Sequence, residues 1–523
     1  MRAGLPILDA WATGAISPQA AAAGAVPHVV AWNLTQRCNL ACAHCYIAAG
    51  SWHSSRTELP TDTCRRIIDE ILEVNPAPML ILSGGEPLLR DDLEAIAAHA
   101  SAGGATVVVG TNGTRLTAER IGSLKAAGVR GVAISVDSLD PTYHDRFRHG
   151  GGALRDALAA VERLRAQQLD FVIQTTLTRG NRADLERLVS WAAAQGAVAF
   201  NLYFIVATGR ATRMQGLSPA ENEDVLRALV RLEREYRGRL MIRSKCQPQL
   251  LRHVHDADPE SPLLNYETRC PCGVHYCRIT PEGLLTPCPY MPVVAGDLRE
   301  SSFGHVWRTS PVFAALRGGA LGGKCGRCEY RKLCGGCRAR AYAQSGDFLA
   351  ADASCAYEPQ GGVPVIERQR AVTYGMAVAE TMTWAPAARQ RLERVPSFVR
   401  GVITARVETW ARERGYAEIT PGVLDEVRRS LPVDFSKRMP FFLRPSQAPE
   451  GRGGGEGEGE GMDGRRRGSG SGLPANPDGA RGPDHVHGQG RSATLPRPRP
   501  RPRPGPASTG SDVPEPPNPA SHA

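Results

Sequence analysis

Three closely spaced cysteines offer the most specific chemistry in this sequence of 523 residues. Cys38, Cys42 and Cys45 lie in the stretch TQRCNLACAHCY, with the spacing Cys-x3-Cys-x2-Cys. Three thiolates can hold three irons of a cubane iron–sulfur cluster, which leaves the fourth iron open to a small chelating ligand. The alternatives are a zinc knuckle that lacks its fourth ligand, or three free cysteines.

A second set of cysteines follows in residues 237–359, a Gly- and Pro-rich segment with few long apolar runs. A segment of this composition generally needs metal sites to stay ordered. Iron–sulfur clusters and zinc both suit its spacing. Cys246, the first cysteine of this set, is either a substrate or iron contact or a plain loop thiol. Cys64 lies outside the set, on the apolar face of a predicted helix, and is expected in the core. The other cysteines of the set are Cys270, Cys272, Cys277, Cys288, Cys325, Cys328, Cys334, Cys337 and Cys355.

The elements that must position these cysteines alternate between strand-like and helix-like patterns. Short apolar strands are predicted at Val29–Leu34, Met79–Leu82, Thr106–Gly110, Gly131–Val136, Phe171–Leu177 and Ala199–Val206. Helices are predicted at Thr61–Glu73, Asp91–Ala102, Thr117–Ala127, Ala153–Gln167, Asp184–Gln195 and Pro219–Tyr236. Such alternation predicts an α/β fold with a parallel sheet and right-handed crossovers. Six units suit a partial (βα)6 TIM-type barrel, with its site at the carboxyl ends of the strands.

Polar motifs stand at those strand ends. Ser83-Gly84-Gly85-Glu86-Pro87 closes the second predicted strand, Thr111-Asn112-Gly113 the third, and Ser135-Val136-Asp137 the fourth. Paired glycines let a backbone approach a ligand closely, and a carboxylate can accept a hydrogen bond from an ammonium group. We therefore expect these motifs and the first three cysteines to form one site.

Together these motifs resemble the radical S-adenosylmethionine (SAM) superfamily over residues 28–236. The resemblance implies a [4Fe–4S] cluster on the three cysteines, which passes one electron to the sulfonium of bound SAM. A 5′-deoxyadenosyl radical then abstracts hydrogen from the substrate. It also implies that the backbone of the motif from Gly84 to Pro87 binds the methionine amino group. Ribose and carboxylate contacts would come from Thr111, Asn112, Ser135 and Asp137.

Two further features have both a role that the family resemblance implies and a simpler structural explanation. His44 stands where the family usually has an aromatic residue beside the adenine, although a lone His is often structural. Asp145-Arg146-Phe147-Arg148 is similar to another family segment, and it is equally a charge cluster that caps a helix.

The later cysteines resemble the SPASM extension of radical SAM enzymes, which holds auxiliary [4Fe–4S] clusters. The resemblance implies one or two such clusters. One would take Cys272, Cys277, Cys288 and Cys337. The other would take Cys325, Cys328, Cys334 and Cys355. Cys270 competes with Cys272, and the gap from Cys334 to Cys337 is one residue shorter than the commonest family pattern.

Further stretches narrow the substrate. Thr208-Gly209-Arg210, Tyr276-Cys277-Arg278 and the run from Cys334 to Tyr342 are similar to the tetrapyrrole-modifying branch. That branch includes the alternative haem synthase, which decarboxylates propionates of an iron-coproporphyrin, and haem d1 biosynthesis enzymes. Gln249 stands at a position where that branch has His, which puts an iron-ligating role there in doubt. Propionates suit an arginine-lined pocket, although each candidate could equally be structural: Arg210, Arg213, Arg243, Arg338 and Arg340.

The segment after the cysteines resembles a small domain on a subunit of light-independent protochlorophyllide reductase. Ser397–Arg414 reads as an amphipathic helix, and Thr420 should cap a second helix. By itself the segment is a docking or packing module. We expect five regions: an N-terminal extension 1–27, the barrel 28–236, the auxiliary cluster domain 237–359, a helical domain 364–445 and a disordered tail 446–523.

The composition bounds location and partners. The net charge of +10 is spread over the folded part, because the tail from Glu450 onward holds 10 Arg against 9 Asp and Glu. Nucleic acid is therefore an unlikely partner. The sequence contains no run of about 18 or more apolar residues, so no membrane span is expected. We expect a cytoplasmic enzyme that receives electrons from a ferredoxin- or flavodoxin-type donor. Two alternatives are a peptide maturase, for which residues 1–27 look too short to bind a leader, and an iron–sulfur or zinc scaffold.

Overall fold

The computed structural model describes residues 25–261, 263–266, 269–367, 378, 380–393 and 395–430. The expected N-terminal extension lies outside these residues up to residue 24. Residues 431–445 of the expected helical domain and the whole expected tail also lie outside them.

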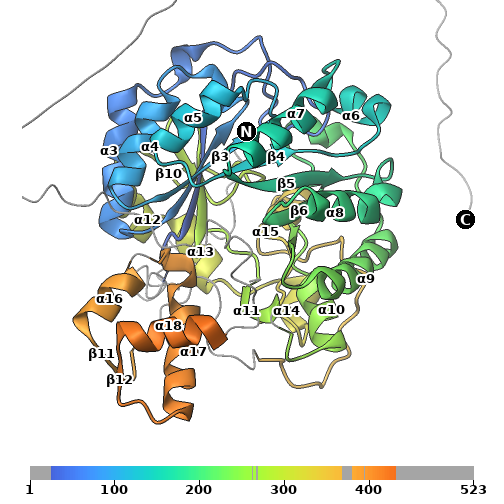
Figure 1. Ribbon diagram of the computed structural model, residues 1–523. Helices are drawn as coiled ribbons and strands as arrows, with labels where there is room; N and C mark the ends of the chain where they lie inside the picture. Colours follow the sequence, from blue (N-terminus) through green and yellow to red (C-terminus); the bar gives the residue numbers. More distant parts are fainter. Residues whose placement is uncertain are drawn as a thin grey trace, which may run out of the picture. The chain divides into compact units, whose positions relative to one another are not determined.

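One twisted sheet forms the centre of the described chain (Figure 1). Its strand order is β10-β9-β8-β1-β2-β3-β4-β5-β6-β7, and the strands from β8 through β1 to β7 run parallel to one another. The six predicted strands are confirmed to within two residues at each end. They are β1 (Val29–Thr35), β2 (Met79–Gly84), β3 (Thr106–Thr111), β4 (Gly131–Ser135), β5 (Asp170–Leu177) and β6 (Ala199–Phe204).

The sheet does not stop at the barrel boundary expected near residue 236. β7 (Met241–Lys245) extends it beyond β6, and β8 (Tyr276–Ile279) pairs with β1 at the opposite edge. A short antiparallel ribbon then follows, made of β9 (Leu284–Thr286) and β10 (Gly296–Asp297). Part of the cysteine-rich segment therefore completes the barrel wall.

Helices cover one face of the sheet, which we call the outer face (Figure 1). They share one core with alternate strand residues such as Trp32 and Phe200, because successive side chains of a strand point to opposite faces. The last of them begins at a capping box of Ser218 and Glu221. The covering helices are α3 (Thr61–Val74), α4 (Leu93–Ala102), α5 (Ala118–Ala126), α7 (Ala153–Ala166), α8 (Leu185–Ala194) and α9 (Pro219–Tyr236).

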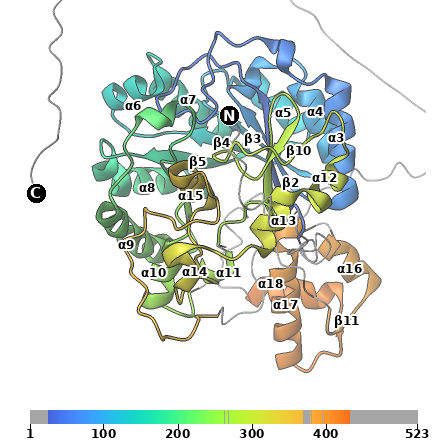
Figure 2. The same ribbon diagram turned by 180° about the vertical axis from the view of Figure 1, so that it is seen from behind.

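The cysteine-rich segment is built from short helices and loops, seen from the other side in Figure 2. α12 and α13 place Phe303, Trp307 and Phe313 in the outer-face core. The helices of this segment are α10 (Leu250–Ala257), α11 (Leu263–Tyr266), α12 (Phe303–Thr309), α13 (Pro311–Gly318), α14 (Gly323–Arg327) and α15 (Arg338–Ser345). No helix among the described residues combines the length and apolar character needed to cross a bilayer.

The opposite, inner face of the sheet is apolar where the strands begin, and the C-terminal helices cover it there. Val395 and Val399 pack against Val108, Ala133 and Val172 of β3, β4 and β5. The Ser397 hydroxyl also hydrogen-bonds to the Asn75 and His28 side chains. The C-terminal elements are β11 (Thr383–Trp384), α16 (Pro386–Glu393), α17 (Ser397–Glu413), β12 (Glu418–Ile419) and α18 (Pro421–Ser430). The predicted helix and its successor, capped by Thr420, are confirmed.

We expect Val399→Asp to lower the melting temperature and to speed tryptic cleavage between residues 367 and 397. Val399 is 2% exposed among apolar side chains, and an unpaired carboxylate buried there costs several kcal/mol. The measurement is thermal unfolding by circular dichroism together with timed proteolysis. Val363→Asp, at a valine that is 43% exposed, should change neither property. An unaltered Val399→Asp protein would show that this contact does not hold the C-terminal helices.

Candidate functional site

The loop after β1 brings three sequence-predicted thiols together. Cys38, Cys42 and Cys45 belong to one small cluster with Leu40 and Ala49. The backbone N–H of Leu40 donates to Cys38 Sγ at 3.4 Å, and that of Ala49 donates to Cys45 Sγ at 3.3 Å. Burial raises the pKa of the Cys38 thiol to about 12, and a bound metal ion would supply the positive charge that stabilises its thiolate.

The glycine pair at the end of β2 packs directly on this cysteine loop. The N–H groups of Gly85 and Glu86 donate to the carbonyls of Thr35 and Arg37, each at 2.8 Å. A Cβ on Gly85 would overlap the Arg37 carbonyl, and Gly84 has a φ of 134° that side chains disfavour. The glycines thus allow one protein loop to approach another, in addition to any ligand. Pro87 follows them and begins the short η2 turn (Pro87–Leu89).

The Glu86 carboxylate is fully buried and turned toward the end of β3. It accepts hydrogen bonds from Thr111 Oγ1 at 2.7 Å, from the Asn112 N–H at 2.8 Å and from the Leu88 N–H at 3.1 Å. Both of its oxygens accept hydrogen bonds from within the protein, so Glu86 holds the end of β3 in place. Asn112, held in this way, donates to Asn39 Oδ1 at 2.9 Å, and its Nδ2 lies 3.9 Å from Cys38 Sγ.

A buried ion pair connects the end of β4 to the cysteine loop. Asp137 is fully buried and accepts from Arg148 Nε at 2.6 Å and from the Thr176 N–H at 2.8 Å. The guanidinium of Arg148 lies 3.9 Å from Cys42 Sγ. Although burial opposes it, the Arg148 charge lowers the pKa of Asp137. Arg148 is the last residue of α6 (Pro141–Arg148), and its motif alone does not predict this ion pair.

The segment Asp145–Arg148 contributes to the start of a helix, as the capping interpretation expects. Asp145 accepts from the N–H groups of Gly152 and Leu154 and so fixes the start of α7. Phe147 stacks on His44 with ring centroids 4.5 Å apart. Burial lowers the pKa of His44 to about 3, so the imidazole stays neutral at physiological pH. Its Nδ1 has no hydrogen-bond partner among the described residues.

Of the candidate arginines, Arg210 belongs to the scaffold of the site. Its Nε donates to the Cys42 carbonyl at 2.7 Å and its Nη1 to the Ala49 carbonyl at 2.8 Å. Arg213 is exposed, and Arg338 donates to the carbonyls of Phe348 and Ala350. Ser135 ends β4 on the inner face, at the register position of Gln174.

A first auxiliary group of thiols gathers beyond the barrel. Cys270 Sγ lies 3.4 Å from Cys272 Sγ, and Cys272 also contacts Cys288. Cys337 contacts Cys270 and Cys246. Cys270 and Cys272 therefore do not exclude one another, since both join the group. Cys246, in a left-handed conformation with a φ of 63°, lies at its edge.

The structure does not bring Cys277 to this group. Cys277 is fully buried and lies opposite Val30 of β1, so it shares the outer face with Trp32 and Ile279. Burial raises the pKa of its thiol, and Arg317 is the one charged side chain of the described residues that opposes this shift. The neighbours Tyr276 and Arg278 point to the inner face instead, as strand alternation requires. The sequence-based placement of Cys277 among the cluster ligands thus disagrees with the structure.

The second auxiliary group matches its predicted set. Cys325, Cys328, Cys334 and Cys355 line one cavity with Gln249. The Asp352 N–H donates to Cys325 Sγ, and the Gly336 N–H donates to Cys334 Sγ, both at 3.4 Å. Within the described part of the chain, no three His, Cys, Asp or Glu side chains converge on a single metal ion. In a cubane each thiolate binds an iron of its own.

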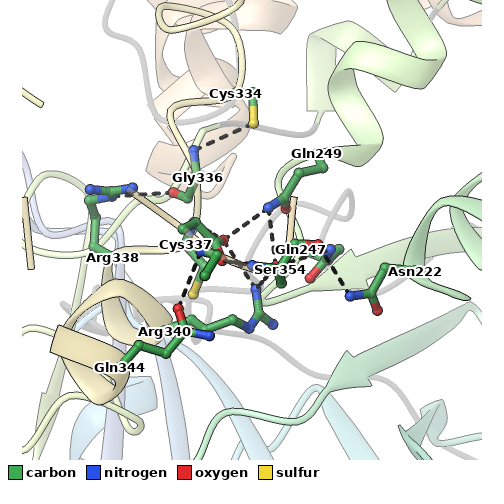
Figure 3. Close-up of polar contacts among 12 residues, drawn as sticks. Asn222, Gln247, Gln249, Cys334, Gly336, Cys337, Arg338, Arg340, Gln344 and Ser354 are labelled. Carbon is green, nitrogen blue, oxygen red and sulfur yellow. Dashed lines mark hydrogen bonds and ion pairs between the residues drawn. The ribbon is translucent and has the colours of Figure 1, made fainter. Parts of the chain in front are cut away.

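A buried polar network separates the two auxiliary groups. Figure 3 shows Arg340, Gln249 and Ser354 converging beside Cys337. The carboxylate at their centre is Asp352, whose Oδ2 accepts from the Cys337 N–H at 2.8 Å, from Gln249 at 2.9 Å and from Arg340 at 3.2 Å. Asp352 thus touches a ligand candidate of each group. Gln249 and Arg340 both donate to this carboxylate.

These donor sets fit the cofactors that the motifs imply. The first loop offers three thiols, two of them with N–H donors to sulfur, beside a neutral imidazole with an unpartnered nitrogen. Each auxiliary group offers at least four thiols and backbone donors. The loop residues Cys38, Cys42 and Cys45 would hold the catalytic cluster, with SAM over the ends of β2 to β4. When bound, the two supply a reductively triggered abstraction of a hydrogen atom.

Family models match three parts of the chain. Residues 32–192 match the radical SAM superfamily, and residues 270–338 match an iron–sulfur cluster-binding domain. Residues 384–428 match a model described as the proto-chlorophyllide reductase 57 kD subunit. The match to the iron–sulfur cluster-binding domain includes Cys270 but not Cys246.

Similar whole proteins point the same way. The chain is 38% identical over 343 residues to an AdoMet-dependent heme synthase of Methanosarcina barkeri, covering 64% of this chain and 97% of that one. An AdoMet-dependent heme synthase of Nitratidesulfovibrio vulgaris is 34% identical and covers 64% and 94%. The crystal structure of Streptococcus suis SuiB bound to S-adenosylmethionine has a TM-score of 0.53 at 16% identity and covers 64% and 78%. That likeness concerns the fold.

The fold, the thiol groups and these matches agree with one another. The zinc and scaffold alternatives account for neither the match to an iron–sulfur cluster-binding domain nor the relatives named as synthases. The chain is an enzyme of the radical SAM superfamily, with a SPASM-type auxiliary iron–sulfur domain and with SAM and [4Fe–4S] clusters as its cofactors.

Proposed function

We propose that this enzyme oxidatively decarboxylates propionate side chains of an iron-coproporphyrin, a late step in making haem. The observation that carries the proposal is the 38% identity to an AdoMet-dependent heme synthase over 97% of that protein's length. The site supports it with a catalytic thiol loop, two auxiliary thiol groups and a polar barrel interior.

The reaction class follows from the cofactors and from the substrate. Conversion of a propionate to a vinyl group releases CO2 and removes one hydrogen atom and one electron from the side chain. One electron from a donor would break the C5′–S bond of SAM and release methionine. The hydrogen atom from the side chain goes to C5′ of the adenosyl group, which leaves as 5′-deoxyadenosine, and the electron from the side chain goes to a one-electron acceptor. A low-potential ferredoxin- or flavodoxin-type protein would supply the electron that cleaves SAM.

This chain's own residues orient and shield that chemistry. Arg148 and Asp137 hold the ends of β4 and β5 beside Cys42. Glu86 holds Asn112 beside Cys38. The apolar cluster formed with Val399 fills the inner face of the sheet near the start of the strands. A dry interior protects a reactive carbon radical from side reactions.

The test is a reaction of the anaerobically purified enzyme with reductant, SAM and iron-coproporphyrin III. We expect 5′-deoxyadenosine, CO2 and a product with vinyl groups in place of propionates, measured by liquid chromatography with mass spectrometry. Deoxyadenosine without any change in the porphyrin would remove the substrate assignment and favour a peptide maturase, while the enzyme class would stand.

A further inference from the structure

The inner face of the barrel becomes polar above its apolar floor. At mid-height it carries Gln174 of β5, Asn201 of β6 and Arg243 of β7, which are paired in register across these three strands. Asn33 of β1 lies on the same face, two residues beyond Ala31. On β8 the register places Arg278 beside Ala31, on this same face. A group of tyrosines completes the lining: Tyr46, Tyr203, Tyr276 and Tyr290, whose burial raises their pKa values.

Arg278 is held firmly at one end of its guanidinium. Its Nε donates to Asn33 Oδ1 at 2.6 Å, and Asn33 in turn donates to the Tyr46 hydroxyl at 2.8 Å. The guanidinium carbon lies 6.0 Å from the centre of the Tyr46 ring, which packs on Tyr290 with centroids 5.1 Å apart. Arg278 is only 7% exposed.

The other end of this guanidinium has no protein acceptor among the described residues. Three other deeply buried arginines form ion pairs with carboxylates: Arg90 with Asp92, Arg148 with Asp137, and Arg340 with Asp352. Arg338 donates to backbone carbonyls. Arg278, by contrast, has neither a carboxylate nor a carbonyl partner in the described chain for its two Nη groups. A buried charge is costly unless it is paired.

The position of Arg278 suits a substrate contact. Tyr46, on which it packs, directly follows Cys45 of the catalytic loop, and its ring packs on Tyr290, two residues after Cys288 of the first auxiliary group. The guanidinium therefore lies beside residues that connect the two thiol groups, where a molecule bound between them would be close to it. Its free edge can bind a carboxylate through two parallel hydrogen bonds.

We propose that Arg278 binds a carboxylate of the substrate, and that Asn33 and Tyr46 orient it for this contact. The proposal rests on the proposed function, in which that carboxylate is a propionate of the porphyrin. The competing explanation is that Arg278 neutralises the thiolates of a neighbouring cluster, in which case its removal would cost iron.

The first experiment replaces Arg278 by Gln and titrates the anaerobic holoenzyme with iron-coproporphyrin III, followed by its Soret absorbance. We expect the dissociation constant to rise about ten- to a hundredfold, the effect of one charge-assisted hydrogen-bonded pair. The iron content should equal that of the wild type. Arg299→Gln, at an exposed arginine paired with Asp297, is the matched control and should bind like the wild type. With the tetramethyl ester of the same porphyrin, wild type and Arg278→Gln should bind alike.

A second variant separates ligand binding from a structural role. Asn33→Asp keeps the shape and the contact with Arg278 but supplies a carboxylate from within the chain. If the charge of Arg278 serves the ligand, this internal pair should weaken porphyrin binding severalfold while the melting temperature is kept. If Arg278 is structural, Asn33→Asp should leave porphyrin affinity unchanged.

The outcomes distinguish this inference from the proposed function. A wild type that does not bind iron-coproporphyrin III overturns the proposed function, and the inference with it. A wild type that binds, with equal affinity in Arg278→Gln or in Asn33→Asp, overturns the inference alone. Loss of about four irons per chain in Arg278→Gln also overturns it, in favour of the cluster-neutralising role.

Discussion

Replacing Cys38, Cys42 and Cys45 together by alanine should abolish cleavage of SAM while leaving about 8 of about 12 iron atoms per chain. Only these thiols belong to the loop after β1 in the described structure. The two auxiliary groups are built from other elements, so their thiols remain in place. Iron and sulfide analysis measures the first effect, and 5′-deoxyadenosine formation under reducing conditions measures the second.

The matched control is Cys64→Ala, which also removes a buried thiol. Cys64 is fully buried on α3, as the sequence predicted, and its Sγ donates only to the Leu59 carbonyl at 3.8 Å. It should keep the full iron content and the cleavage of SAM. A triple variant that still forms deoxyadenosine, or that loses all of its iron, would contradict the assignment of three independent cluster sites.

The parallel strands were predictable because burial on both faces demands continuous apolar runs with β-branched residues. β2 and β3 are of this kind, as MLILSG and TVVVGT show. β7 escaped prediction because MIRSK places polar side chains on the inner face. β8 escaped because its partner is β1, with Val29 opposite Tyr276, and no local pattern signals a pairing across so much of the chain.

In the candidate site, too, local sequence patterns predict some residues, whereas others depend on contacts between separate elements. The spacing of cysteines within one loop is enough to predict a cluster site, because a single loop can bring all of its thiols together. The role of Glu86 depends on the ends of β2 and β3 lying side by side, which only the sheet register determines. Asn33 could not be recognised because its partner, Arg278, comes from β8, far away in the sequence. Arg148 could not be recognised because it reaches Asp137 only where α6 folds back on the end of β4. For Cys277 the signal was present: in Tyr276-Cys277-Arg278-Ile279, strand alternation groups Cys277 with Ile279.

The alternation of side chains in β8 also predicts a large difference in iron content between variants of two cysteines, Cys270 and Cys277. Cys270→Ala should lose one auxiliary cluster, about 4 of about 12 iron atoms per chain, whereas Cys277→Ala should keep them all. Cys270 lies 3.4 Å from Cys272 and also contacts Cys337, so it completes a set of four with Cys288. Cys246→Ala should also keep its iron, because four thiols already serve the cubane and the domain match begins at Cys270.

Anaerobic iron analysis, with electron paramagnetic resonance of the reduced proteins, measures this contrast. The signal of the first auxiliary cluster should vanish in Cys270→Ala and persist in Cys277→Ala. To supply a ligand, Cys277 would have to turn from the outer-face core to the inner face. That means a one-residue shift of β8 against β1, which would bury Tyr276 and Arg278 among apolar side chains. Iron loss in Cys277→Ala with retention in Cys270→Ala would therefore contradict both the ligand set and the register of β8.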